Sequence, residues 1–258
     1  MEIPIIVSSC DPFRDAWGPF FHFFFKQWPD CPHPVYLLTN YGHYRDERVR
    51  CLQLGRDRSW ADNLRLALDR LNAQHILYFQ EDFFLTRRVP TAELQADLAF
   101  AMEHQTAYLG FYPLPQPEEG SFRGHPRIGR CARAARLRVS LQATYWNVAA
   151  LRSLLRPGET GWDMEEFGSD RSRELLFLRF NSFATTPIDY FFTAIVRGAW
   201  QPEAVAMCRA EGITLDLKFR PVRPVTKWQK ARRKWQCQLE RVRQAVWPRA
   251  FDIPALPH

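Results

Sequence analysis

The most informative feature of the sequence is a pair of carboxylates that follows a predicted strand. Residues 75–79 are apolar enough for a buried strand, and Glu81 and Asp82 come directly after its end. Carboxylate oxygens are ligands that Mg²⁺ and Mn²⁺ prefer, and a divalent cation bound there can neutralise the charge of a diphosphate leaving group. The alternative is an ordinary strand end, whose carboxylates cap the next turn or pair with nearby arginines.

The segments around this strand alternate between strand and helix patterns. Short apolar strands are expected at residues 3–7, 35–38 and 49–54. Helices are expected at residues 12–28 and after Ser59, which is a good N-cap. Polar residues follow the first two strands, and ligands of α/β proteins bind at the carboxyl edge of the sheet. The sequence therefore predicts an α/β sheet that carries the carboxylate pair at that edge.

The second half of the chain is less regular. A helix is expected at residues 91–104, strands at 107–112 and 139–146, and another helix to about residue 155. Residues 113–138 form a long connection rich in Pro, Gly and Arg. Its arginines could steer an anionic ligand or simply solvate the loop, and solvation is the favoured interpretation. These arginines are Arg123, Arg127, Arg130, Arg133, Arg136 and Arg138.

A chain of 258 residues, 46% of them hydrophobic, can bury one substantial core. We expect one main domain at residues 1–220 and a tail at 221–258. The six cysteines are well separated and form no CxxC pair, which disfavours a disulfide framework or a zinc site. The first residues lack a cationic region before an apolar one, and no run of about eighteen apolar residues follows. We therefore expect a cytoplasmic protein.

Most of the excess positive charge lies in the tail. Residues 218–249 contain eleven Lys and Arg against one acid, whereas residues 1–217 contain 24 basic and 26 acidic residues. Apolar side chains recur at three- and four-residue steps over residues 225–247, which predicts a basic amphipathic helix. This helix could bind an anionic membrane surface from the inner face, bind nucleic acid, or pack on the protein's own core. The near-neutral main domain makes nucleic acid an unfavoured partner.

Several of these segments together resemble the nucleotide-binding half of GT-A glycosyltransferases. The first strand ends in Ser-x-Cys-Asp at residues 8–11, the second ends in Thr-Asn at 39–40, and a helix containing Asn63 precedes the triplet at 80–82. The resemblance covers residues 3–85 well and points to transferases of bacterial surface-polysaccharide loci. It implies an α/β fold with a GT-A-like (Rossmann-like) mixed sheet flanked by helices, followed by a basic C-terminal helical tail.

The resemblance assigns roles to the residues at the strand ends. Many members carry Asp-x-Asp where this chain has Gln80 first and Asp82 third. Asp82 is therefore the leading ligand for Mn or Mg, and Glu81 is the second. Asp11 would contact the base or ribose, although it could also be the N-cap of the following helix. The residues expected to bind the nucleotide-sugar donor are Ser8, Asp11, Asn40, Asn63, Glu81 and Asp82.

An inverting transferase also needs a carboxylate that accepts the proton of the acceptor hydroxyl. Members of the family usually carry it beyond the metal motif, near a helix start, where this chain has residues 162–166. Glu165 is the predicted catalytic base, and Asp163 is the second candidate. Trp162 and Glu166 are predicted to contact the acceptor, since a tryptophan suits the face of a sugar. The alternative is an ordinary acidic helix start, which the helix dipole favours.

The resemblance implies an enzyme that moves a sugar from a nucleotide-diphosphate sugar to a hydroxyl of a saccharide or lipid-linked saccharide, with inversion. The expected product is a surface glycan such as lipopolysaccharide or capsule. One alternative is an inactive relative, because Gln80 replaces the usual aspartate. Another is a nucleotide-binding module whose tail binds nucleic acid, although the chain has no GxxxxGK[ST] or GxGxxG phosphate motif.

Overall fold

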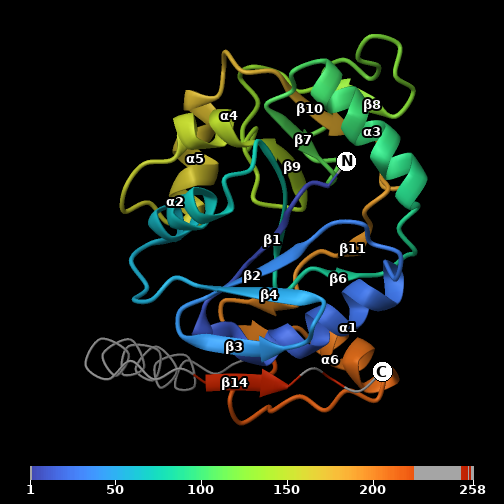
Figure 1. Ribbon diagram of the computed structural model, residues 1–258. Coiled ribbons are helices and arrows are strands. Elements are labelled where there is room, and N and C mark those ends of the chain that lie inside the picture. Colours follow the sequence, from blue (N-terminus) through green and yellow to red (C-terminus); the bar gives the residue numbers. More distant parts are fainter. Residues whose placement is uncertain (1, 224–250, 255, 257–258) are drawn as a thin grey trace.

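The computed structural model describes residues 2–223, 251–254 and 256, and its centre is an eight-stranded sheet. The strands of this sheet are β1 (Ile5–Ser8), β2 (Val35–Thr39), β4 (Val49–Gln53), β5 (His75–Gln80), β7 (Tyr108–Gly110), β8 (Ile128–Arg130), β9 (Thr144–Asn147) and β10 (Phe177–Phe180). Their spatial order is β4-β2-β1-β5-β9-β7-β10-β8 (Figure 1). Strands β8 and β9 run antiparallel to their neighbours, and the other pairings are parallel.

Helices cover both faces of this sheet (Figure 1). They are the 3₁₀ helix η1 (Asp11–Ala16) and the α-helices α1 (Trp17–Gln27), α2 (Trp60–Leu71), α3 (Thr91–Glu103), α4 (Val148–Leu154), α5 (Gly161–Arg171) and α6 (Pro202–Ala210). Successive side chains of a strand point to opposite faces, so Ile5 and Val7 share a core with α1, α3 and α6, whereas Ile6 packs with α2, α4 and α5. The predicted α/β fold, a Rossmann-like mixed sheet flanked by helices, is confirmed.

Helix α2 illustrates how local sequence places an element beside the site. The Ser59 hydroxyl accepts the backbone N–H of Asp62 at 3.0 Å, as its predicted N-cap role requires. Leu64 and Leu68, one turn apart, are buried against the sheet. The helix ends at Asn72, whose left-handed φ of 46° breaks the helical path. The predicted helix after Ser59 is thus confirmed.

Three strands differ from what the pattern predicts. Strand β8 lies inside the connection expected at residues 113–138, and it pairs with β10. Strand β10 itself has no sequence signal, because the charged Arg179 interrupts its short apolar run. Strand β9 begins at Thr144, five residues after the predicted start. These strands are three or four residues long, so their pairing partners determine them more than their own periodicity does.

Smaller ribbons complete the fold. They are β6 (Phe84–Leu85) with β11 (Tyr190–Phe191), β12 (Ile195–Val196) with β13 (Ala199–Trp200), and β3 (Gly42–Arg45) with β14 (Phe251–Pro254). The last pairing brings the end of the predicted tail back beside the main domain, in parallel with β3 (Figure 1). The predicted amphipathic helix at residues 225–247 lies outside the described residues. None of the helices in the described part of the chain has the length and apolar character needed to span a bilayer.

Candidate donor and catalytic site

Five of the six residues predicted to bind the donor, all except Asn63, lie at the carboxyl edge of three neighbouring strands. Strand β5 lies beside β1 in parallel, and Ser8 is level with Gln80 in the register. Strand β2 lies on the other side of β1. Because these strands point the same way, residues 8–11, 40–42 and 81–82 share one edge of the sheet, as predicted.

Asp82 is buried at this edge, and one of its oxygens is already bonded. Its Oδ2 accepts the Thr193 hydroxyl and the backbone N–H of Ile195, the latter at 3.2 Å. Burial raises the pKa of the Asp82 carboxyl to about 6, although these two hydrogen bonds oppose the rise. A buried carboxylate of this kind is a candidate cation site.

Glu81, the neighbouring carboxylate, is also buried, with 7% of its surface exposed. Burial raises the pKa of its carboxyl well above the usual value, and the negative charge of Asp82 raises it further. Arg220 lowers the pKa of both groups by its positive charge. Its guanidinium is fully buried and donates to the Asp15 carboxylate at 2.6 and 2.7 Å. The positive charge of Arg220 therefore acts on both carboxylates, although its guanidinium is already paired with Asp15.

We expect the charge of Asp82 to reduce the stability of the metal-free protein as the pH rises. A carboxyl whose pKa is higher in the folded state binds protons preferentially there. The stability of the fold therefore falls as the pH rises from about 4, the pKa in the unfolded state, to about 6, the pKa in the folded state. Asp82→Asn should remove this loss. The variant should therefore be more stable than the parent by on the order of 2 kcal/mol at pH 7, with little difference at pH 4. Denaturant unfolding with EDTA at both pH values measures this difference, and an equal effect at both would contradict it.

Asp11 joins the loops after β1 and β2. It is fully buried, and its carboxylate accepts the backbone N–H groups of Asn40 at 2.9 Å, Tyr41 at 3.0 Å and Gly42 at 3.2 Å. The Asn40 side chain accepts the Asp11 N–H in return, at 3.0 Å. Burial raises the pKa of the Asp11 carboxyl, and the three N–H groups oppose the rise. Asp11 shapes the strand edge, and direct contact of Asp11 or Asn40 with a donor stays a prediction.

Asp11→Ala should destabilise the fold by about 3 kcal/mol or more, because three buried backbone N–H groups would lose their acceptor. Asp216→Ala is the matched control, since the Asp216 carboxylate also accepts two backbone N–H groups but lies on the surface. That control should cost less than about 1 kcal/mol. Equilibrium denaturant unfolding measures both values. Equal losses of stability in the two variants would contradict the expectation that the buried hydrogen bonds of Asp11 are the more costly to remove.

Ser8 and Asn63 are the two remaining predicted donor contacts, and both are partly exposed. Ser8 ends β1 directly opposite the end of β5. Asn63 lies in the first turn of α2, and its Nδ2 donates to the Asp57 carboxylate at 2.7 Å. Its Oδ1 is buried and has no hydrogen-bond partner among the described residues. Direct contact of Ser8 or Asn63 with a donor stays a prediction.

Glu165 is linked to the end of β5 through the backbone of Leu141. Its Oε1 accepts the Leu141 N–H at 2.7 Å, and Gln80 donates its side-chain N–H to the Leu141 carbonyl at 3.3 Å. Helix α5 approaches closely because Gly161 lies against Leu141, where a Cβ would come within 2.8 Å of its side chain. Burial raises the pKa of the Glu165 carboxyl. Hydrogen bonds from the Leu141 N–H and the Ser140 side chain oppose this rise. A carboxylate that is held in place and raised in pKa suits a general base.

The other acidic residues at the start of α5 have different surroundings. The Asp163 carboxylate accepts the Thr160 N–H at 2.8 Å and its hydroxyl at 2.7 Å, which forms a capping box. These bonds lower the pKa of the exposed Asp163 carboxyl. Trp162 is 82% exposed, and Glu166 is also exposed. Glu165 is therefore partly buried and bonded to Leu141, whereas Asp163 caps the helix, and acceptor contact by Trp162 and Glu166 stays a prediction.

Glu81 and Asp82 alone offer too few ligands for the predicted divalent cation, so a bound substrate would have to supply others. Among residues 2–223, 251–254 and 256, no three His, Cys, Asp or Glu side chains are grouped closely enough to hold a metal ion. Mg²⁺ commonly binds through one or two carboxylates, with phosphate oxygens and water as the other ligands. Two buried carboxylates match that arrangement. A cation bound there would supply charge neutralisation for a diphosphate.

The long arginine-rich connection is more ordered than solvation alone predicts. Arg127 donates to both carboxylate oxygens of the buried Asp97 at 2.8 and 2.9 Å. Arg138 is also buried and donates to the carbonyls of Cys131 and Ala132, each at 2.9 Å. Arg138 also donates to the Leu175 carbonyl at 2.5 Å. The prediction that these arginines solvate a loop is thus wrong for these two, because Arg127 pairs with a carboxylate of α3 and Arg138 bonds backbone carbonyls inside and beyond the connection.

Several residues at the site carry no sequence signal. Thr193 and Ile195 bind Asp82, and Leu141 binds Glu165, yet two of these three contacts use backbone N–H groups, which every residue type offers. Among these three contacts, only that of the Thr193 hydroxyl uses a side chain. Arg220 lies far along the chain, at the last residue of the predicted main domain.

No protein-family model matches this chain, and no curated protein matches it either. Similar solved structures include residues 1–349 of S. aureus TarS. The TM-score is 0.49 at 14% identity, and the match covers 96% of this chain and 73% of that chain. This chain spans 44% of the longer TarS chain to which it is also similar. Another similar structure is that of the galactosyltransferase LgtC, solved with donor and acceptor sugar analogs. Its TM-score is 0.40 at 11% identity, and the match covers 93% of this chain and 96% of that chain.

A third similar structure is CMP:2-keto-3-deoxy-manno-octonic acid synthetase complexed with CTP. Its TM-score is 0.46 at 10% identity, over 82% of this chain and 98% of that chain. One of these proteins is a glycosyltransferase by name, which is the class that the sequence resembles. All three TM-scores are below 0.5, so the functional assignment depends on the chain's own residues.

Proposed function

We propose that this protein transfers a sugar from a nucleoside-diphosphate sugar to a hydroxyl of a saccharide, with inversion, in the synthesis of a surface glycan. One observation carries the proposal. Two buried carboxylates, Glu81 and Asp82, follow the central strand, and Glu165 is connected to the same strand end through Leu141. A cation site and a positioned base are the two groups that metal-dependent, inverting sugar transfer uses.

Each group would then have a separate task. Glu81 and Asp82 would bind Mn²⁺ or Mg²⁺ together with the donor diphosphate, and the ion would neutralise the charge that develops on the leaving group. The Leu141 N–H orients Oε1 of Glu165, and the Glu165 carboxylate would accept the proton of the acceptor hydroxyl. The acceptor oxygen forms the new bond to the sugar carbon as the bond to the diphosphate breaks on the opposite face. The products are the glycoside, with its anomeric configuration inverted, and a nucleoside diphosphate.

The finer parts of the proposal concern the acceptor and its location. A lipid-linked saccharide would place the protein on the inner face of a membrane, where a basic amphipathic helix at residues 225–247 could bind anionic headgroups. The formal charge of +7 and its concentration in residues 218–249 support this location. Asn63 and Ser8 are proposed to contact the donor from the neighbouring elements.

Turnover of a nucleotide-sugar panel tests the proposal. The full-length protein is incubated with each donor and Mn²⁺, and release of the nucleoside diphosphate is measured with and without a mixture of simple glycosides. At least one donor should be consumed, with loss of turnover in EDTA. Consumption of no donor by a folded protein, or equal turnover in EDTA, would contradict the proposed metal-dependent transfer.

A further inference from the structure

Four aromatic side chains gather beside the candidate site and have no role in the proposed chemistry. They are Tyr112, Phe183, Tyr190 and Phe192, called the aromatic platform below. The Tyr112 ring lies 5.1 Å from that of Phe183, 5.2 Å from that of Phe192 and 6.3 Å from that of Tyr190, measured between centroids. These distances are typical of direct aromatic contact, so the four rings form one cluster.

The platform is exposed although its residues are large and apolar. Phe183 is 45% exposed and Phe192 is 48% exposed, while Tyr112 and Tyr190 are partly exposed. Single exposed apolar residues are common on proteins, but a contiguous group is more often a binding surface. The two phenylalanines lie on different segments, one after β10 and one after β11, and Tyr112 bridges them.

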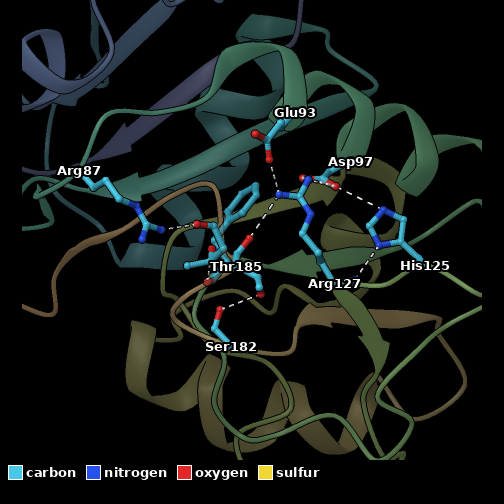
Figure 2. Close-up of polar contacts among 9 residues, drawn as sticks. Arg87, Glu93, Asp97, His125, Arg127, Ser182 and Thr185 are labelled. Atoms are coloured by element: carbon cyan, nitrogen blue, oxygen red, sulfur yellow. Dashed lines mark hydrogen bonds and ion pairs between the residues drawn. The ribbon is translucent and has the colours of Figure 1, made fainter.

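The loop that carries Phe183 is fixed by polar contacts on its buried side. Arg127, bonded to Asp97, also donates to the Thr185 carbonyl at 3.4 Å (Figure 2). Arg87 donates to the Thr186 carbonyl at 2.7 Å, and the Thr186 hydroxyl donates to the Phe111 carbonyl at 2.8 Å. Because Phe111 precedes Tyr112, these contacts tie both sides of the platform together. A surface fixed before binding loses little freedom when a ligand arrives.

The platform adjoins both groups that would perform the chemistry. Phe192 directly precedes Thr193, whose hydroxyl binds the Asp82 carboxylate. Tyr190 donates its hydroxyl to the Gln142 side chain at 2.8 Å, and Gln142 directly follows Leu141, which positions Glu165. A ligand on these rings would therefore lie next to the cation site and the base, where an acceptor has to be.

We infer that the aromatic platform binds a pyranose ring of the acceptor, with its C–H face against the rings of Phe183 and Phe192. A pyranose combines an apolar C–H face with a rim of hydroxyl groups, so it suits aromatic faces that have polar neighbours. The Tyr112 hydroxyl and the Gln142 amide provide such neighbours. An alkyl chain would gain nothing from these polar groups. This inference rests on the proposed function, because it names the acceptor of the same reaction.

Saturation-transfer difference NMR with methyl glycosides of common hexoses and N-acetylhexosamines tests this inference on the full-length protein with the diamagnetic ion Mg²⁺ and a nucleoside diphosphate. At least one glycoside should receive saturation, strongest at the ring protons of one face. Phe192→Ala and Phe183→Ala should each reduce that signal by fivefold or more. Phe167→Ala is the matched control, since Phe167 is 51% exposed on α5 and belongs to no described contact of the platform. It should leave the signal unchanged.

Three results would overturn the inference. These are an absence of saturation for every glycoside, an unchanged signal in both Phe192→Ala and Phe183→Ala, and saturation of n-octanol with none of any glycoside. The melting temperatures of the variants should remain within a few degrees of the parent, which separates lost binding from lost folding. Nucleoside-diphosphate binding is measured in the same samples. Its absence from the parent would contradict the proposed function, whereas its presence without glycoside binding contradicts the platform alone.

Discussion

Replacing Glu165 with glutamine is expected to reduce turnover by about a hundredfold or more while donor affinity stays the same. The amide oxygen of glutamine can still accept the Leu141 N–H, so the loop and helix α5 keep their contact. The amide cannot accept the proton of an acceptor hydroxyl, which removes general-base catalysis from the transition state. Steady-state turnover with the best donor and acceptor, together with calorimetric donor binding, measures both quantities.

Asp163→Asn is the control for this experiment. Asp163 lies on the same helix and bonds Thr160 at the cap, but its carboxylate is exposed. We expect turnover within about threefold of the parent and a small loss of stability from the weaker capping box. Retained turnover in Glu165→Gln with loss in Asp163→Asn would move the catalytic base to the helix start.

Asp82→Asn is expected to abolish metal-dependent donor binding, with an affinity loss of about a hundredfold or more. The substitution keeps the side-chain volume and an oxygen that can accept from Thr193 and Ile195. It removes the anionic oxygen that a hard divalent cation requires. Titration calorimetry of the nucleoside diphosphate in the presence of Mn²⁺ measures the loss. Glu81→Gln should be milder, and an equal loss would show that the two carboxylates share the ion.

Asp189→Asn provides a matched control for the aspartate. The Asp189 carboxylate also accepts a threonine hydroxyl, from Thr86 at 2.7 Å, but it is separate from the Glu81 and Asp82 pair. We expect unchanged Mn²⁺-dependent binding in this variant. If Asp82→Asn bound the diphosphate and Mn²⁺ as tightly as the parent, the assignment of the metal site would be wrong.

The half of the fold that carries the donor site could be predicted from the sequence, because its strands are apolar runs that end in polar residues. Parallel strands deliver their carboxyl ends to one edge, so the positions of Asp11, Asn40 and Asp82 relative to one another followed from the strand assignments alone. The burial of Glu81 and Asp82 was not predicted, because the sequence indicates only that they follow a buried strand.

The second half could not be predicted in the same detail, because tertiary contacts determine it. Strand β10 contains a buried Arg179, which breaks the apolar pattern and donates to the Arg138 carbonyl at 3.1 Å. The contacts that position Asp82 and Glu165 come from Ile195 and Leu141, which use backbone N–H groups with no sequence signature. The aromatic platform combines residues from three segments, and no spacing along the chain reveals it.

The most direct test of the central claim is a thermal-shift screen of nucleoside diphosphates with Mn²⁺ and, in parallel, with EDTA. A ligand present at a hundredfold its dissociation constant adds about 2.7 kcal/mol to the stability of the folded state. We predict such stabilisation by at least one nucleoside diphosphate with Mn²⁺, its loss in EDTA and its loss in Asp82→Asn. Stabilisation by no nucleoside diphosphate, or equal stabilisation in EDTA and in Asp82→Asn, would contradict a metal-dependent donor site at the end of β5.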